Sequence, residues 1–557
     1  MGYFKIFTAL IMSFVMFLSN GITSLFPGTP AEQKSEAELL KMADLFEKYE
    51  LSDDIYVVNG GVSKDERASI QSLQGLVARD KSTIFINYGM DSKTELAFLE
   101  NAGYKLVYTD ENGNNWTLKN LVPRFASHIK NNSYVLFTST ETTEQINMAF
   151  NYATVYGCLA VPESCEETAK ALGMKKAYDL TEKEITVNDQ DAFYEEHKAL
   201  FRTDALIHQN YMVSGLRDFA VQQNIFITYA MDSDYVQRTF RDKVLSELEP
   251  ASIVFGWCQY EVKFTESASS FGHYVIPSDH CFNMTILNAC EAQQISEKKE
   301  IKAPELDPEK HYIAIVYSDG DNAQWISNGF QEFHTWQSYN LDTPVTWTFA
   351  PLMNEFSPVA IKKATDNIGN CSLITGPSGA GYARISKMSA DKLEAYSDFT
   401  AATMLASGLT TITLLDEPLS LPGFLWENKL SYFARYDNIN GGILQIDPTR
   451  YAGGEGKVFF VDDKPFVSVR LSLWYPSGNA DEVTNEWLKE QVEIVNNYPA
   501  DISSISGYSV INVHPWTVGP DDLAYFVSQL DDGVEVISAD ELIAAVTQNV
   551  PHKTAKP

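Results

Sequence analysis

The chain has 557 residues, and its 74 acidic side chains outnumber the 42 basic ones, so its formal net charge is -32. Hydrophobic residues at 45% and charged residues at 21% are ordinary values for folded domains and exclude wholesale disorder. The acidic excess argues against nucleic acid or an anionic membrane surface as partner, because both are bound by clustered lysine and arginine.

The first 24 residues have the pattern of a secretory signal peptide. Lys5 precedes an apolar run at residues 6–18, which is too short to span a bilayer of about 30 Å as a helix. Small residues near Ser19 and Ser24 suit cleavage. We therefore expect a secreted or periplasmic protein without membrane contact after cleavage, and an uncleaved N-terminal anchor is the alternative.

Residues 25–198 alternate strand-like runs with helical patterns, which predicts several small α/β subdomains. Strands are expected at 54–58, 82–88, 104–108 and 133–139, and helices at 37–50, 64–78 and 94–102. A further α/β subdomain is expected over 199–296, with strands at 225–229 and 252–257 and a helix at 237–248. The charged, proline-containing segment 297–310 is typical of a linker.

The stretch 311–550 predicts a TIM-like (β/α) barrel. Eight β-rich runs lie at 311–318, 345–350, 371–375, 411–415, 441–446, 465–473, 509–513 and 533–537. Apolar strands that alternate with helices indicate a parallel sheet covered on both faces, and eight units over this length suit such a barrel. Residues 457–464 resemble a hairpin arm and not a helix, so a seven-stranded or distorted barrel stays open.

The carboxyl ends of barrel strands carry the working face, so the residues just past each strand are the candidate site. Four carboxylates are the candidate catalytic residues: Asp319, Asp321, Asp416 and Glu417. The candidate substrate-binding residues are Asn322, Trp325, Trp347, Gly379, Gly381, Tyr382, Arg384, Arg470, His514 and Trp516. The glycine-rich run 376–381 lacks a nucleotide-binding spacing, so its glycines are expected to let the backbone approach a ligand, with Tyr382 at the rim.

Paired carboxyl groups at opposing strand ends suit glycoside hydrolysis, in which one acid protonates the leaving oxygen and a second carboxylate attacks or activates water. We expect Glu417 to be the acid and Asp321 or Asp319 the nucleophile or base. Retention and inversion both stay open. Simpler explanations also stay open: a turn at residues 318–322, a strand end at 416–418, a structural His514 and core tryptophans.

The segment Gly379-Ala380-Gly381-Tyr382-Ala383-Arg384-Ile385 resembles the motif that names the GxGYxYP family of glycoside hydrolases. Similar blocks surround it: 318–322 with Trp325, 347–351, 514–516, and upstream Gly256-Trp257 followed by Glu261 and Asn283. The resemblance covers about residues 53–546 and implies a multi-part N-terminal α/β region, a C-terminal barrel-like domain and a sugar-processing role. Arg384 and Ile385 stand where the motif has Tyr and Pro, so a guanidinium replaces a stacking ring at this position.

Two alternatives to a hydrolase of oligo- or polysaccharides remain. One is a metal-dependent carbohydrate deacetylase with Asp319, Asp321 and His514 as ligands, although the sequence has no HxxxH motif. The other is a glycan-binding protein that does not turn over its ligand. For the hydrolase itself we expect neither a cofactor nor a metal.

Overall fold

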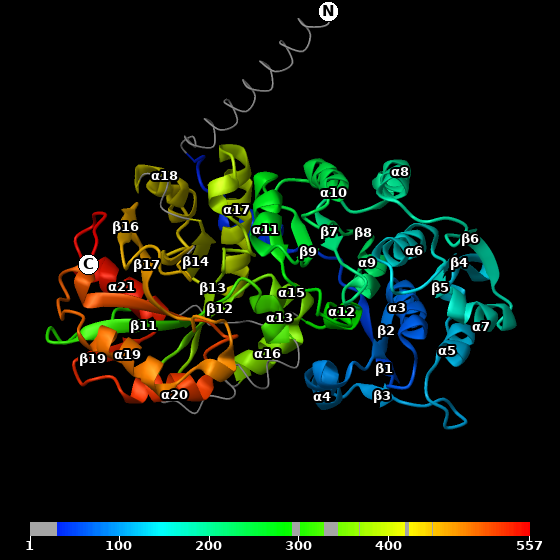
Figure 1. Ribbon diagram of the computed structural model, residues 1–557, viewed down its shortest axis with the longest axis horizontal. Helices are drawn as coiled ribbons and strands as arrows, with labels where there is room; N and C mark the ends of the chain where they lie inside the picture. The colour runs from blue at the N-terminus through cyan, green and yellow to red at the C-terminus, as the bar shows by residue number, and fades with distance from the viewer. Residues whose placement is uncertain (1–29, 292–300, 328–342, 367, 418–422, 448) are drawn as a thin grey trace, which may run out of the picture.

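The computed structural model describes residues 30–291, 301–327, 343–366, 368–417, 423–447 and 449–557 (Figure 1). The predicted signal peptide at 1–24 and residues 297–300 of the predicted linker lie outside these ranges. Among the helices in the described ranges, none combines the length and the apolar character needed to cross a bilayer.

The N-terminal half contains three separate parallel sheets. The first has the order β2-β1-β3 and the second the order β5-β4-β6. Their strands are β1 (Glu50–Val58), β2 (Lys81–Ile86), β3 (Lys105–Val107), β4 (Ser133–Phe137), β5 (Leu159–Pro162) and β6 (Lys175–Asp179). The third sheet has the order β10-β9-β7-β8, with strands β7 (Ala205–His208), β8 (Phe226–Thr228), β9 (Ile253–Gly256) and β10 (Tyr274–Ile276). Figure 1 shows this third sheet between the barrel and the first two sheets.

Helices cover and join these sheets. They are α2 (Glu36–Ala43), α3 (Lys64–Ala78), α4 (Lys93–Asn101), α5 (Leu118–Arg124), α6 (Thr143–Tyr156), α7 (Glu166–Ala171), α8 (Val187–His197), α9 (Arg217–Gln223), α10 (Tyr235–Glu247), α11 (Glu261–Ser270) and α12 (Met284–Leu287). The helix predicted over 37–50 is shorter, since α2 ends at Ala43. The chain leaves the helix there because Phe46 packs into the core, with its ring 5.3 Å from that of Phe219 and 5.8 Å from that of Phe255.

The C-terminal part is a closed barrel of seven parallel strands. They are β11 (His311–Tyr317), β12 (Thr346–Phe349), β13 (Ser372–Thr375), β14 (Thr411–Asp416), β15 (Gly441–Ile446), β17 (Lys464–Leu473) and β18 (Tyr508–Val513). The eighth predicted run is β19 (Val534–Ile537), which pairs with His311–Ala314 at the start of β11, while β12 pairs with the last two residues of β11. The predicted hairpin arm is β16 (Val458–Val461), antiparallel to β17. The TIM-like fold is confirmed, in its seven-stranded form.

Helices surround the barrel and close one end of it. The flanking helices are α13 (Asn322–Ser327), α15 (Met353–Phe356), α16 (Pro358–Asp366), α17 (Ala390–Ser407), α18 (Gly423–Ala434), α19 (Asn485–Asn496) and α20 (Pro520–Ser528). The last helix, α21 (Ala539–Asn549), begins with hydrogen bonds to Thr346 and Thr411, the first residues of β12 and β14. Because α21 also packs on β11, β17 and β18, it covers the amino end of the barrel and leaves the carboxyl end for function.

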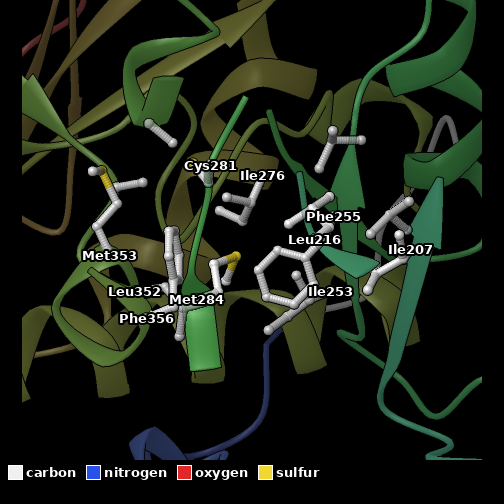
Figure 2. Packing of buried hydrophobic residues seen from close by; sticks show 14 of the residues in the cluster. Ile207, Leu216, Ile253, Phe255, Ile276, Cys281, Met284, Leu352, Met353 and Phe356 are labelled. Atoms are coloured by element: carbon white, nitrogen blue, oxygen red, sulfur yellow. The ribbon is translucent and has the colours of Figure 1, made fainter. Parts of the chain in front are cut away.

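The third domain, the α/β unit around the β10-β9-β7-β8 sheet, shares its hydrophobic core with the barrel. Figure 2 shows Phe255 of β9 and Met284 of α12 packed near Leu352, Met353 and Phe356 from the barrel side. The rings of Phe255 and Phe356 meet edge to face with centroids 5.7 Å apart. This continuous apolar contact holds the carboxyl edge of the third sheet beside that of the barrel.

Candidate active site

Asp319 follows β11 and is held by three partners at the carboxyl end of the barrel. Its Oδ2 lies 3.1 Å from Nε2 of His514, and its Oδ1 accepts hydrogen bonds from Tyr451 Oη at 3.0 Å and the Gly320 amide at 2.7 Å. Only 8% of the residue is exposed, and this burial acts to raise its pKa. The charge of His514 and the hydrogen bonds outweigh burial, so the pKa of Asp319 lies below its ordinary value.

His514 is fixed in orientation by its neighbours. Its ring stacks on Trp474 with centroids 3.7 Å apart and planes 5° apart, and its Nδ1 lies 3.2 Å from Thr517 Oγ1. Since Nε2 faces Asp319, the imidazole cannot rotate freely, and it presents one edge to the carboxylate. The predicted binding residue His514 therefore lies inside the cluster, with its Nε2 in direct contact with Asp319.

Asp321 lies beside Asp319, and its pKa is displaced in the opposite direction. Trp516 Nε1 donates a 3.0 Å hydrogen bond to Asp321 Oδ1. Burial raises the pKa of Asp321 well above its ordinary value, and the negative charge of Asp319 raises it further. Two neighbouring carboxyl groups with pKa values displaced in opposite directions are the arrangement that acid–base chemistry requires.

Glu261, the first residue of α11, brings a third carboxyl group into the cluster from the third domain. Its Oε1 accepts a 2.8 Å hydrogen bond from Tyr382 Oη, and the Tyr382 ring stacks on Trp257 at 6.2 Å. Burial raises the pKa of Glu261, and the charge of Asp319 adds to the effect. The candidate list from strand ends omitted Glu261, and its only signal was the Gly256-Trp257…Glu261 block of the family resemblance.

Arg384 is completely buried and connects the motif loop to two other elements. Its Nη2 donates to Tyr382 Oη at 3.3 Å and pairs with Asp447 Oδ2 at 3.2 Å, while its Nε donates to Thr265 Oγ1 at 3.3 Å. Burial raises the pKa of Asp447 even though Arg384 opposes this. The residue that departs from the family motif thus joins the end of β15 to helix α11.

The motif glycine Gly381 allows close approach of the third domain, where the approach of a ligand had been expected. Gly379 instead packs against Thr400 of α17, 2.8 Å from the position of an added Cβ. A Cβ on Gly381 would lie 2.6 Å from Tyr274 Cδ2 and 2.7 Å from Ile276 Cδ1. Val275 of β10 and Tyr382 exchange both backbone hydrogen bonds, at 2.8 and 2.9 Å. Tyr382 is only 1% exposed and so is not at the rim, because the edge of the third sheet covers it.

A second glycine, Gly320, allows the segment 319–321 to pack against the motif loop that contains Tyr382. A Cβ at this position would lie 2.2 Å from Cε1 of Tyr382. The segment between Asp319 and Asp321 therefore packs directly on the Tyr382 ring, which places both aspartates next to the residue that binds Glu261. Asn322 extends the same contact by donating from Nδ2 to the carbonyl of Gly376.

The remaining candidate carboxylates have different surroundings. Asp416 is fully buried and accepts from Ser386 N at 2.7 Å, Ser386 Oγ at 2.6 Å and Glu417 N at 2.7 Å. These bonds occupy both of its oxygens in holding the segment that follows the motif. The Glu417 side chain is 39% exposed, and its Oε2 lies 3.8 Å from Lys387 Nζ.

Two predicted binding residues lie away from this cluster. Trp347 is buried in the core, stacked on Tyr317 at 4.3 Å. Arg470 lies toward the amino end of the barrel, where its Nη1 donates to Ser506 O at 3.1 Å and Ser509 Oγ at 3.3 Å. The physical reason is an irregularity in β17, because the register with β18 shifts between Val469 and Leu471. The Trp325 side chain lies outside the described part of the structure.

The arrangement of the candidate residues can also be compared with the metal site that a metal-dependent deacetylase would need. Within the described ranges, no group of three or more His, Cys, Asp or Glu side chains is arranged to hold a metal ion. Asp319 and His514, two of the three suggested ligands, bind each other. In this geometry the Asp319 carboxylate and the His514 ring occupy each other's contact atoms.

Comparison with known proteins identifies three segments of one family. Residues 131–198 match the "GxGYxYP_N second domain", 201–289 the "GxGYxYP third domain" and 309–547 the "GxGYxYP putative glycoside hydrolase C-terminal domain". No curated protein matches. Among solved structures, a putative hydrolase from Bacteroides thetaiotaomicron is similar with a TM-score of 0.74 and 24% identity, over 90% of this chain and 96% of that chain, which shows a shared fold. The chain belongs to the GxGYxYP family, as its motif predicted.

Proposed function

We propose that this protein is a glycoside hydrolase whose reacting carboxyl groups come from both the barrel and the third domain. The observation that carries the proposal is the opposed pair Asp319 and Asp321, one with a lowered and one with a strongly raised pKa, at the carboxyl end of the barrel. The family description supports the reaction class. The chain of three contacts Asp319–Gly320–Tyr382–Glu261 supports a composite site.

Asp321 is the proposed general acid. Its raised pKa means that it holds its proton to higher pH than a free aspartate, and it gives this proton to the glycosidic oxygen as the bond to the anomeric carbon breaks. Ionised Asp319 maintains that state through its negative charge. We prefer Asp321 over Glu417 for this role because Glu417 is considerably exposed and faces Lys387.

Glu261 is the proposed base or nucleophile. It reaches the cluster from the third domain, and its raised pKa places it nearer to neutral pH, where a general base is most effective. It either removes a proton from the water whose oxygen bonds to the anomeric carbon, or it bonds to that carbon itself. In the second case water, deprotonated by Asp321, then attacks the anomeric carbon and releases the sugar and the Glu261 carboxylate. The apolar run at 6–18 supports the additional proposal that the mature chain is exported and acts on glycans outside the cytoplasm.

The test is sugar release by the chain from residue 25 onward, measured as reducing ends on a panel of polysaccharides and aryl glycosides. Asp321→Asn and Glu261→Gln should each reduce turnover by a factor on the order of 100 or more. Glu417→Gln is the matched control and should retain at least about a tenth of the activity. If the wild type binds a glycan and releases no sugar from any substrate, the protein is a glycan-binding member of the family, consistent with Arg384 in the motif.

A further inference from the structure

Exposed apolar side chains lie in or directly after two loops at the carboxyl edge of the third sheet, with Tyr235 at the first position of α10. Met231 and Tyr235 follow β8, and Tyr260 follows β9; Tyr235 is 74% and Tyr260 43% exposed. Val236 and Val262, also exposed, lie next to these residues in the sequence. We use the name aromatic strip for the two tyrosines, Tyr235 and Tyr260, together with the neighbouring apolar side chain of Met231. Exposed apolar side chains are usually scattered singly over a protein surface. Several of them on one edge of a sheet therefore indicate a binding surface.

The two loops of the strip are fixed to each other. The thiol of Cys258 donates to Asp232 Oδ2 at 3.3 Å and lies 3.6 Å from the carbonyl oxygen of Ala230. Asp232 in turn pairs with Arg241 Nη1 at 3.0 Å, and both side chains are buried. A buried, hydrogen-bonded ion pair beneath the loops gives their exposed rings a defined position, which lowers the entropic cost of binding a ligand.

The strip is continuous with the candidate active site. Tyr260 immediately precedes Glu261, whose carboxylate accepts the hydrogen bond from Tyr382. Trp257, in the same loop, stacks on the Tyr382 ring. Because β9 lies between β10 and β7 in the sheet, the strip leads from the barrel contact at β10 across the third domain toward β8.

The chemistry of the strip suits a neutral sugar chain. Tyrosine presents an apolar ring face with a polar hydroxyl, and here the exposed Gln259 and Ser233 add hydrogen-bonding groups beside the rings. Arg238 lies 6.0 Å from the Tyr235 ring and Lys263 5.8 Å from the Tyr260 ring, so each ring is supported on one side. The net charge of -32 disfavours polyanionic glycans.

Resting on the proposed function, we propose that the aromatic strip binds the sugar units beyond the bond to be cleaved. The substrate is then a neutral oligo- or polysaccharide several units long, and the third domain provides both Glu261 and the surface that holds the chain. A protein that cut only terminal sugars from short conjugates would have no use for ordered tyrosines along this edge.

The test compares Tyr235→Ala and Tyr260→Ala with Tyr108→Ala, an exposed tyrosine that directly follows β3 of the first sheet. The readout is the ratio of kcat/KM on the best polysaccharide of the panel to kcat/KM on the best aryl glycoside. We expect this ratio to fall at least tenfold in each strip variant and to stay within twofold in Tyr108→Ala. An unchanged ratio in both strip variants would overturn the proposal and leave the hydrolase assignment intact.

Binding is tested separately, so that failure of the hydrolase assignment does not obscure the result. Affinity electrophoresis in gels containing β-glucan, xylan, mannan, galactan or α-glucan is run on Asp321→Asn with and without Tyr235→Ala. If Asp321→Asn is retarded in a gel and the addition of Tyr235→Ala reduces this retardation, the result supports glycan binding by the aromatic strip, even if no substrate is turned over. Absence of retardation in all five gels, or retardation insensitive to Tyr235→Ala and Tyr260→Ala, would contradict it.

Discussion

The hydroxyl of Tyr382 donates a 2.8 Å hydrogen bond to Glu261, joining the barrel's motif loop to the first residue of a helix in the third domain. Backbone hydrogen bonds between Tyr382 and Val275 fix the same junction. The family motif is therefore an interface motif as well as a part of the site. Gly381 of the motif allows the third sheet to approach, and Tyr382 orients Glu261, a carboxyl group that comes from the third domain.

Tyr382→Phe should change the ionisation of Glu261. The hydroxyl stabilises the carboxylate and lowers its pKa against the opposing effect of burial, so its removal raises the pKa of Glu261. If Glu261 acts as the base, the acidic limb of the pH–activity profile moves to higher pH, and activity on that limb falls by about tenfold per unit of displacement. A kcat profile from pH 4 to 8 measures this, with Tyr525→Phe as control. An acidic limb at the same pH in Tyr382→Phe would remove Glu261 from the base role.

Arg384→Met should destabilise the protein because it leaves Asp447 and Tyr382 without their buried partner. Breaking a buried ion pair costs about 3 kcal/mol of unfolding free energy, and the partial exposure of Asp447 makes this an upper value. Urea unfolding of Arg384→Met, Asp447→Asn and the double variant forms a double-mutant cycle. We expect the double variant to lose less stability than the sum of the two single losses. Strict additivity would show that the pair does not stabilise the fold.

Most strands of the barrel, and the two aspartates that follow β11, could be predicted from local sequence patterns. The predicted strand runs agree with β11–β15, β17 and β18 to within one or two residues, because each is a short apolar run bounded by polar residues. Parallel strands place their carboxyl ends on one side, so Asp319 and Asp321 after β11 and His514 and Trp516 after β18 had to be near each other.

The remaining parts of the site depend on contacts between distant segments. Glu261 enters from another domain, and no pattern within the barrel sequence could indicate it. Tyr382 was expected at the rim and is buried, since its cover is β10, more than a hundred residues upstream. Arg470 was placed at the site by its position in a long strand, whereas the register shift beside it leaves its guanidinium at the opposite end.

Gly381→Ala should separate the motif loop from the third sheet. The added methyl group would overlap Tyr274 and Ile276, and such overpacking typically costs about 1–3 kcal/mol. Gly533→Ala is the matched control, because a Cβ there meets no atom within 4 Å and its backbone does not need positive φ. Urea unfolding should show the loss for Gly381→Ala alone, accompanied by lower turnover. Equal stability of the two variants would mean that the loop can move away from β10 without penalty.

Acid should destabilise the fold through three buried histidines. Burial lowers the pKa of His208 to about 3, and the charge of Arg241 contributes; burial likewise lowers the pKa of His273 and His311 to about 4. Their unfolded forms bind protons from about pH 6.5 downward while the folded forms stay neutral, so the stability they provide is complete above pH 6.5 and is lost toward pH 4. Asp540, whose pKa burial raises to about 6, acts in the opposite direction between pH 6 and 3.8.

The hydrogen bonds of these histidines explain why protonation is unfavourable. In His273, Nδ1 accepts from the Ser252 amide at 3.3 Å and Nε2 donates to the Leu245 carbonyl at 2.8 Å, and in His208, Nε2 accepts from the Ala230 amide at 2.9 Å. A second ring proton would point at an N–H group in either residue. The contribution of each histidine to the unfolding free energy should therefore fall by about 1.4 kcal/mol per pH unit below pH 6. Urea unfolding at pH 7, 5.5 and 4.5 measures this contribution as the difference between the wild type and His273→Gln, which cancels the opposing effect of Asp540. A difference that is independent of pH would mean that folded His273 accepts the proton.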